Sequence, residues 1–234
     1  MGAKKIAAFH ALLVLSVALS GCISESNKSS YSNNDSMYEI PDYFEDGIFT
    51  CLEHDNLTRC WQTHVPETLD SSTPVPLIVD MHGFGSHSTE QRHMSSFDTI
   101  SEEEGFIVVY PDGDSSVDKL TGNTNQAWNA GWCCSHSVNE DIDDVGFIEK
   151  MIQVVIEKYN IDTNRIYASG WSNGCAMSQR LAMESSHIFA AVGCMAMYLL
   201  TEHTTTYSPI PVMEVHGFLA VSYTHLRAHE TVVH

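Results

Sequence analysis

Four short apolar runs, none of which alternates with polar residues, constrain the fold of this chain more than any other feature of its sequence. They occupy residues 77–81, 106–110, 165–169 and 212–215. Such runs are typical of strands that are buried on both faces of a parallel sheet. A fifth run, residues 190–195, is a further strand candidate, although its small residues would also suit a helix. The pattern predicts a buried, mostly parallel sheet.

The segments between these runs are long enough to hold helices. The clearest helix begins near Asp141 and carries apolar residues at helical spacing, namely Val145, Ile148, Ile152, Val155 and Tyr159. Strands that alternate with helices in this way imply right-handed crossovers and helices on both faces of one open sheet, so we expect an α/β fold. Residues 112–139 lack periodicity and follow a strand end, which makes them a candidate binding loop.

A Gly-Trp-Ser-Asn-Gly sequence at residues 170–174 directly follows the run 165–169 and precedes a helical stretch. A serine in this strand-turn-helix context is typical of a nucleophile elbow, in which a sharp turn exposes a weakly nucleophilic hydroxyl to a base. Ser172 is the predicted nucleophile. The N-terminus of the helix behind it favours the negative charge that develops during acyl transfer.

A second glycine-containing turn, His82-Gly83-Phe84-Gly85, directly follows the run 77–81. Such a turn can direct a backbone N–H group at a developing oxyanion, so the N–H groups of Phe84 and Asn173 are the predicted oxyanion hole. The alternative is a glycine turn that only reverses the chain. His82 itself is expected to be structural.

The charge of the chain excludes some functions. It has 30 Asp and Glu residues against 11 Lys and Arg residues, for a formal net charge of −19. This excess repels phosphate backbones and anionic headgroups, so we expect no nucleic-acid partner and no electrostatic docking on lipid. With 43% hydrophobic residues, the chain can still bury the core of one domain.

The first 21 residues are interpreted as a secretory signal. Lys4 and Lys5 precede an apolar run at 6–19 that is short for a membrane span. The run ends in Leu-Ser-Gly-Cys, which resembles a prokaryotic lipobox, so Cys22 is the predicted lipid-bearing residue and the lipid is the predicted membrane contact. The alternative is an ordinary signal peptide with a stray cysteine. Residues 22–40 are expected to form a polar tether, and residues 41–220 the folded domain.

Six cysteines remain after Cys22, which suits an exported, oxidised protein. A bridge between Cys51 and Cys60 would close a short loop and contribute about 2.7 kcal/mol in the chain-entropy model. Cys175 is expected either to pair with Cys133 or Cys134 or to remain a buried thiol.

A metal site at Cys133, Cys134 and His136 is not expected, because adjacent cysteines fit one tetrahedral ion poorly. The acidic residues at 140–144 are interpreted as a complement to the dipole of the following helix.

Four segments together resemble the α/β-hydrolase esterases grouped as poly(3-hydroxybutyrate) depolymerase-like and feruloyl esterase-like proteins. The segments are residues 76–83, 130–134, 143–148 and 169–177, and the resemblance runs from about His54 to Gly217. It implies hydrolysis of carboxylic esters through an acyl-Ser172 intermediate, with no metal or organic cofactor. It also implies that Trp128 and Trp132 border the acyl pocket, although plain packing of both rings is an open alternative.

The chain departs from this family after Gly217. Serine hydrolysis on this fold needs an acid and then a histidine after the nucleophile, and Ala220 stands where the family's His-Gly-x-x-Asp pattern has its acid. We therefore expect a truncated domain that lacks its last strand and helix, with little activity. Residues 221–234 resemble translated adapter sequence and are interpreted as a non-native tail. The competing idea, that His225, His229 or His234 acts as the base, has no orienting residue to support it.

The sequence therefore predicts a secreted, lipid-anchored serine esterase. Its expected substrates are ester-containing polymers or small molecules: polyhydroxyalkanoates, feruloyl esters or acetyl esters. A serine peptidase or acyltransferase on the same fold is the first alternative. A hydrolase-like protein that binds a ligand without catalysis is the second.

Overall fold

The computed structural model describes residues 49–117, 122, 124–132, 136–201 and 208–217. They all belong to the chain unit formed by residues 40–234. The predicted signal, Cys22 and tether, and the tail at 221–234, lie outside the described residues. No helix in the described part of the chain is both long and apolar enough to cross a membrane.

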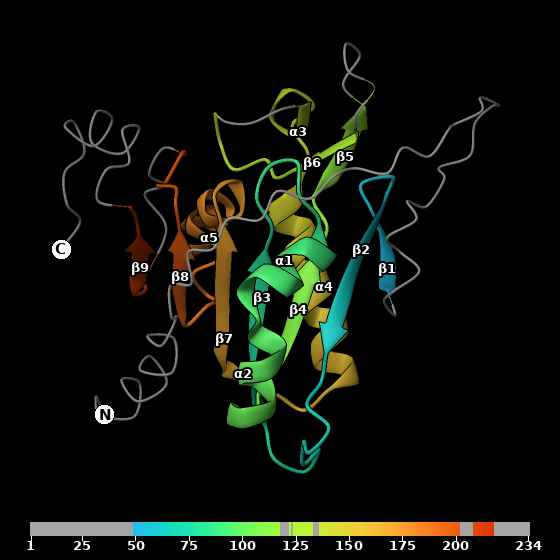
Figure 1. Ribbon diagram of the computed structural model, residues 1–234, viewed down its shortest axis with the longest axis vertical. Helices are drawn as coiled ribbons and strands as arrows, with labels where there is room; N and C mark the ends of the chain where they lie inside the picture. Colours follow the sequence, from blue (N-terminus) through green and yellow to red (C-terminus); the bar gives the residue numbers. More distant parts are fainter. Residues whose placement is uncertain (1–48, 118–121, 123, 133–135, 202–207, 218–234) are drawn as a thin grey trace, which may run out of the picture. The chain divides into compact units, whose positions relative to one another are not determined.

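Seven strands form one sheet in the order β1-β2-β4-β3-β7-β8-β9 (Figure 1). The strands β3, β4, β7, β8 and β9 run parallel, and β1 and β2 form an antiparallel hairpin that joins the sheet through β4. The bounds are β1 Phe49–His54, β2 Leu57–His64, β3 Val75–Met81, β4 Ile107–Pro111, β7 Ile161–Trp171, β8 Ala191–Met195 and β9 Val212–Val215. The predicted α/β class and mostly parallel sheet are confirmed.

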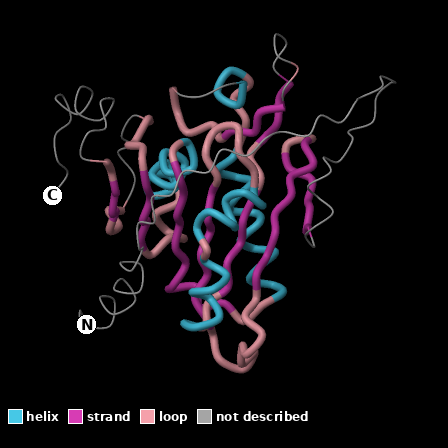
Figure 2. Tube along the Cα trace, viewed as in Figure 1, coloured by secondary structure: helices cyan, strands magenta, loops and turns pink. Residues whose placement is uncertain are grey.

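Helices cover both faces of this sheet. The helices α1 (Ser88–Ser95) and α2 (Phe97–Glu104) lie on the near face in Figure 1, and α4 (Asp144–Lys158) lies on the far face and packs against α5 (Asn173–Glu184). Apolar residues of α4 meet those of β3 and β4 in the core, among them Phe147, Ile148, Met151, Leu77 and Val109. The short helix α3 (His136–Asn139) follows the antiparallel strands β5 (Asp114–Val117) and β6 (Thr124–Ala127) (Figure 2).

The structure resolves two points that the sequence left open or placed differently. Residues 191–195 form a strand, so the helical alternative for this segment is wrong. The predicted loop at 112–139 contains the β5–β6 hairpin and α3, whose short polar elements have no apolar periodicity to reveal them.

The helix expected near Asp141 begins at Asp144. Asp143 caps it, because its side chain accepts a hydrogen bond from the Gly146 N–H at 2.9 Å. Asp143 therefore complements the helix start, as expected. Asp144 differs from the expectation, because it is fully buried and paired with Arg59.

Two disulfides hold the described residues. Cys51 and Cys60 are bridged across the β1–β2 hairpin, as predicted. Cys175 is bridged to Cys194, so the prediction that Cys175 pairs with Cys133 or Cys134 is wrong. The physical reason is strand register: β8 pairs with β7 so that Cys194 stands opposite Gly170, close to the start of α5. Cys133 and Cys134 lie outside the described residues.

Candidate active site

Ser172 occupies a sharp turn between β7, which ends at Trp171, and α5, which begins at Asn173. Its backbone has φ 52° and ψ −116°, a conformation that non-glycine residues rarely adopt. The Ser172 N–H donates to the Met195 carbonyl on β8 at 2.8 Å, which fixes the turn to the neighbouring strand. The residue is partly exposed.

Two glycines allow this turn to pack against the end of β3. A Cβ atom on Gly174 would collide with the carbonyl oxygen of Met81 and would stand 2.5 Å from that of His82. A Cβ atom on Gly170 would stand 2.5 Å from the carbonyl group of Gly174. Because these neighbours are backbone atoms, they cannot move aside as a flexible side chain would.

The two glycine-containing motifs meet at Ser172. A Cβ atom built on Gly83 would lie 3.5 Å from the Cβ of Ser172 and 3.1 Å from the Cδ1 of Trp171. No described residue accepts a hydrogen bond from the Phe84 N–H. The Asn173 N–H is the first of α5, and the first N–H groups of a helix have no partner within the helix. Two backbone donors therefore stand on segments that flank the serine.

His82 holds the turn from inside. Its side chain is fully buried, and burial lowers its pKa to about 4. Its Nε2 accepts from the Gly113 N–H at 2.9 Å, so the proton is on Nδ1, which donates to the Gly83 carbonyl at 2.8 Å. The neutral ring thus has the structural role expected for it.

The side chain of Asn173 connects the elbow to the segment that follows β6. Its Oδ1 accepts from the Trp128 N–H at 2.8 Å, and its Nδ2 donates to the Trp128 carbonyl at 3.2 Å. The Trp128 indole is fully buried and donates to the His82 carbonyl at 2.9 Å. Trp128 therefore packs beneath the site, as the packing alternative describes, because its indole N–H has its partner in the interior. Its role at an acyl pocket stays a prediction.

A family model described as esterase PHB depolymerase matches residues 65–220, more than half of the chain. The chain belongs to this family.

Curated relatives of this family member align over part of their length. Feruloyl esterase B of Piromyces equi is 29% identical over 58% of the chain and 24% of the relative. The bifunctional acetylxylan esterase/xylanase XynS20E of Neocallimastix patriciarum is 25% identical over 61% of the chain, and feruloyl esterase B of Thermothelomyces thermophilus is 26% identical over 62%. The match spans 19% of XynS20E and 48% of the Thermothelomyces thermophilus esterase, so the chain corresponds to less than half of each of these relatives.

Solved structures agree with the fold. The crystal structure of native pOPH superposes with a TM-score of 0.58 at 17% identity, covering 74% of this chain and 70% of that one. The crystal structure of a thermostable esterase superposes with a TM-score of 0.50 at 15% identity, covering 76% and 57%. At these identities the likeness concerns the fold alone.

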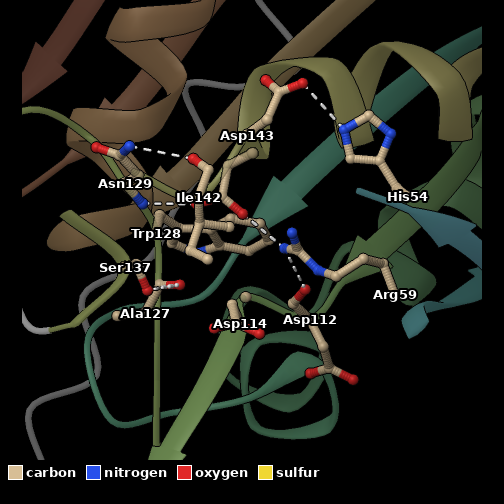
Figure 3. Close-up of polar contacts among 12 residues, drawn as sticks. His54, Arg59, Asp112, Asp114, Ala127, Trp128, Asn129, Ser137, Ile142 and Asp143 are labelled. Atoms are coloured by element: carbon tan, nitrogen blue, oxygen red, sulfur yellow. Dashed lines mark hydrogen bonds and ion pairs between the residues drawn. The ribbon is translucent and has the colours of Figure 1, made fainter. Parts of the chain in front are cut away.

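A buried ion pair that sequence reasoning missed fastens the 112–144 segment to the sheet (Figure 3). The Arg59 Nη2 donates to Asp144 Oδ1 at 2.6 Å and to the Asp112 carbonyl at 3.2 Å, and its guanidinium lies 4.1 Å from the centre of the Phe147 ring. The second oxygen of Asp144 accepts from the Asn129 N–H at 2.6 Å. Because Asn129 follows Trp128, this pair also supports the segment that Asn173 holds.

Two further carboxyl groups lie buried beside the site. Asp80 on β3 accepts from the Gln91 Nε2 at 3.0 Å, and burial raises its pKa to about 6. Burial also raises the pKa of Asp112 to about 6, although the N–H and hydroxyl of Ser88 donate to its side chain. The only sequence signal for Asp80 is a charged residue within an apolar strand.

The remaining residues considered in the sequence analysis lie at the surface, beside β9 or outside the described residues. Trp132 is 66% exposed, and the neighbouring Gly131 packs against the Leu200 backbone. His216, at the end of β9, lies 3.2 Å from a carboxylate oxygen of Glu214. In the described part of the chain, no hydrogen bond involves the Ser172 hydroxyl and no group of three or more His, Cys, Asp or Glu side chains is placed to hold a metal ion. Ala220, His225, His229 and His234 lie outside the described residues.

Proposed function

We propose that this protein is a carboxylic ester hydrolase in which Ser172 attacks the ester carbonyl and carries the acyl group. The observation that carries the proposal is the strained turn at Ser172, which packs so closely against the Gly83 turn that a Cβ atom built on Gly83 would lie 3.5 Å from the Ser172 Cβ. This is the geometry that acyl transfer needs, because a nucleophile and two backbone donors must surround one carbonyl group.

In the proposed reaction, the Ser172 hydroxyl gives its proton to a general base as its oxygen bonds to the carbonyl carbon, and the carbonyl oxygen becomes an anion. The N–H groups of Phe84 and Asn173 donate to that anion. Collapse of the tetrahedral intermediate breaks the bond to the alcohol, which leaves with a proton, and water then releases the acid from Ser172. On this fold a general base and an orienting acid complete the scheme, and both follow the nucleophile along the chain. Because Ala220 stands where the family has its acid, we expect this chain by itself to turn over little ester.

The proposed substrates are ester-containing polymers or small molecules, because the relatives include feruloyl and acetylxylan esterases and the family is described as esterase PHB depolymerase. We also propose an extracytoplasmic location with Cys22 as a lipid anchor. The two disulfides support an oxidising compartment. Replacing Cys22 with alanine should release the protein from the membrane fraction, and retention of this variant there would refute the anchor.

The decisive experiment does not depend on the base. We expect a Ser172→Cys variant to be acylated by p-nitrophenyl acetate, because a thiol at a helix N-terminus ionises readily and needs no general base. Release of one equivalent of p-nitrophenol should be about tenfold faster than from a Ser71→Cys variant, which carries an exposed thiol far from any oxyanion donor. The native cysteines are common to both variants. Equal rates, or an acyl group found by mass spectrometry at another residue, would contradict the proposal.

A further inference from the structure

Residues 126–128, called the bridging segment below, contact both parts of the chain that carry the proposed oxyanion donors. They are hydrogen-bonded to the turn 82–85 on one side and to the first residue of α5 on the other. These three parts of the chain are far apart in the sequence. Their relative positions therefore depend on such contacts.

Two hydrogen bonds join the bridging segment to the turn on either side of Phe84. The Gln126 carbonyl accepts from the Gly85 N–H at 2.8 Å, and the Trp128 indole N–H donates to the His82 carbonyl at 2.9 Å. The bonded groups of the turn thus belong to residues that precede and follow Phe84. Because hydrogen bonds are directional and hold the chain at both points, the Phe84 peptide has little freedom to rotate.

A carboxamide joins the bridging segment to α5. Asn173 Oδ1 accepts from the Trp128 N–H and Nδ2 donates to the Trp128 carbonyl, so both ends of the amide bind one residue. The Asn173 side chain is fully buried, and a buried amide is unfavourable unless both of its ends are hydrogen-bonded. This requirement leaves the side chain one stable orientation, which fixes the direction of the Asn173 N–H group.

Two further contacts keep the bridging segment from moving on its own. The next residue, Asn129, accepts from the Arg180 Nη1 through its carbonyl at 2.5 Å and donates through its N–H to Asp144 Oδ2 at 2.6 Å. Arg180 belongs to α5, so this helix holds the chain at its first residue and again further along. The Asp144 carboxylate is fully buried and paired with Arg59. The bridging segment, α5 and the turn therefore form one hydrogen-bonded unit.

The separation of the two donors matters because both must reach one oxygen atom. An oxyanion is stabilised by N–H groups whose nitrogens lie about 2.7–3.1 Å from it, and donors fixed in advance need no rearrangement during the reaction. Hydrogen bonds weaken steeply when they are lengthened or bent. A small change in the separation of the Phe84 and Asn173 nitrogens would therefore cost one of the two bonds.

We propose that the Trp128 indole and the Asn173 carboxamide set the separation and the direction of the Phe84 and Asn173 N–H groups. Trp128 is common to both connections, since its indole binds the turn and its backbone binds α5. Trp128 and the Asn173 side chain are thus positioning residues, which act through the backbone. The inference rests on the proposed function and adds to it the residues that hold the oxyanion hole in shape.

Two reactions of the thiol in the Ser172→Cys variant separate positioning from general structure. Acylation by p-nitrophenyl acetate forms an oxyanion, whereas alkylation by iodoacetamide displaces iodide and forms none. Adding Trp128→Phe, which keeps a ring but removes the indole N–H, should slow acylation about tenfold and leave alkylation within about twofold. Asn173→Ala, which removes both hydrogen bonds to Trp128, should do the same. Unchanged acylation, or equal slowing of both reactions, would overturn the inference.

A matched control and a double variant complete this experiment. Trp61→Phe makes the same change at an equally buried tryptophan of β2, which β4 separates from β3 in the sheet, and should leave both rates within about twofold. Because the two positioning side chains act on one unit, Trp128→Phe combined with Asn173→Ala should slow acylation only by about the larger of the single factors. Slowing by the product of the two factors would show that they act independently and would overturn their joint role.

The directions of the two N–H groups can also be measured without any reaction, by residual dipolar couplings in ¹⁵N-labelled protein. Trp128→Phe should change the coupling at Phe84, Asn173→Ala should change the coupling at residue 173, and Trp61→Phe should change neither. Unchanged couplings in the first two variants would overturn the inference. Failure of the proposed function is a separate result, because the couplings would change as expected while the Ser172→Cys thiol was acylated no faster than the Ser71→Cys thiol.

Discussion

Gly174 lies directly against the carbonyl group of Met81, so the backbone of the first turn of α5 touches the backbone at the end of β3. A Gly174→Ala substitution would push the two apart and should destabilise the protein by about 3 kcal/mol in urea unfolding. Gly217→Ala is the matched control, because no atom of the described residues lies within 4 Å of a Cβ at that position, and its effect should stay within about 0.5 kcal/mol. Equal effects of the two substitutions would show that this contact is not close in solution.

Removing one partner of the Arg59–Asp144 pair should be costly. Asp144→Asn leaves the buried Arg59 guanidinium without a counter-charge, and we expect a loss of about 3–5 kcal/mol in the free energy of unfolding. Asp162→Asn breaks the more exposed Arg165–Asp162 pair and should cost less than about 1 kcal/mol. A small loss for Asp144→Asn would mean that water reaches Arg59.

The two disulfides should differ in their effect on the active site. Replacing Cys175 and Cys194 with alanine should cost about 3 kcal/mol, and replacing Cys51 and Cys60 about 2.7 kcal/mol, in the chain-entropy model. Only the first pair joins the start of α5 to β8. We therefore expect its loss to slow the acylation of the Ser172→Cys variant, and loss of the second pair to leave that rate unchanged. Equal slowing by both would show that the Cys175–Cys194 bridge has no specific effect on the position of residue 172.

The raised pKa of Asp80 predicts a specific pH dependence of the free energy of unfolding. Burial raises its pKa to about 6 in the folded protein, from 3.8 in the unfolded chain. The stability that its proton contributes is complete below pH 3.8 and is lost as the pH rises through 6, a difference of about 3 kcal/mol. Asp80→Asn should remove this part of the pH profile when the free energies of unfolding at pH 4 and pH 7.5 are compared. An unchanged profile would show that Asp80 ionises normally.

The parts of the fold that the sequence predicted are those that depend on local pattern. The buried strands β3 and β4 and the strand β7 are visible as apolar runs, and the strand-turn-helix context of Ser172 is local too. The run 212–215 also forms a strand, β9, but the prediction that it is buried on both faces is wrong, because β9 lies at the edge of the sheet and Val212 and Val215 are exposed. The β1–β2 and β5–β6 hairpins were missed, because their residues are mostly polar or partly exposed.

Features that depend on contacts between distant residues could not be read from the chain. The partner of Cys175 depends on the register between β7 and β8. The burial of Trp128 and the pairing of Arg59 with Asp144 depend on contacts between residues that are far apart in the sequence. The position of Trp171 beside Ser172 and against the turn at Gly83 likewise depends on how β3 and β7 come together.

The most direct test of the account is a crystal structure of the Ser172→Cys variant after acylation. We predict a thioester at position 172 whose carbonyl oxygen lies about 2.7–3.1 Å from the backbone nitrogens of both Phe84 and Asn173. A thioester whose oxygen points away from both nitrogens, or a thiol at position 172 that remains unmodified while other residues react, would contradict it.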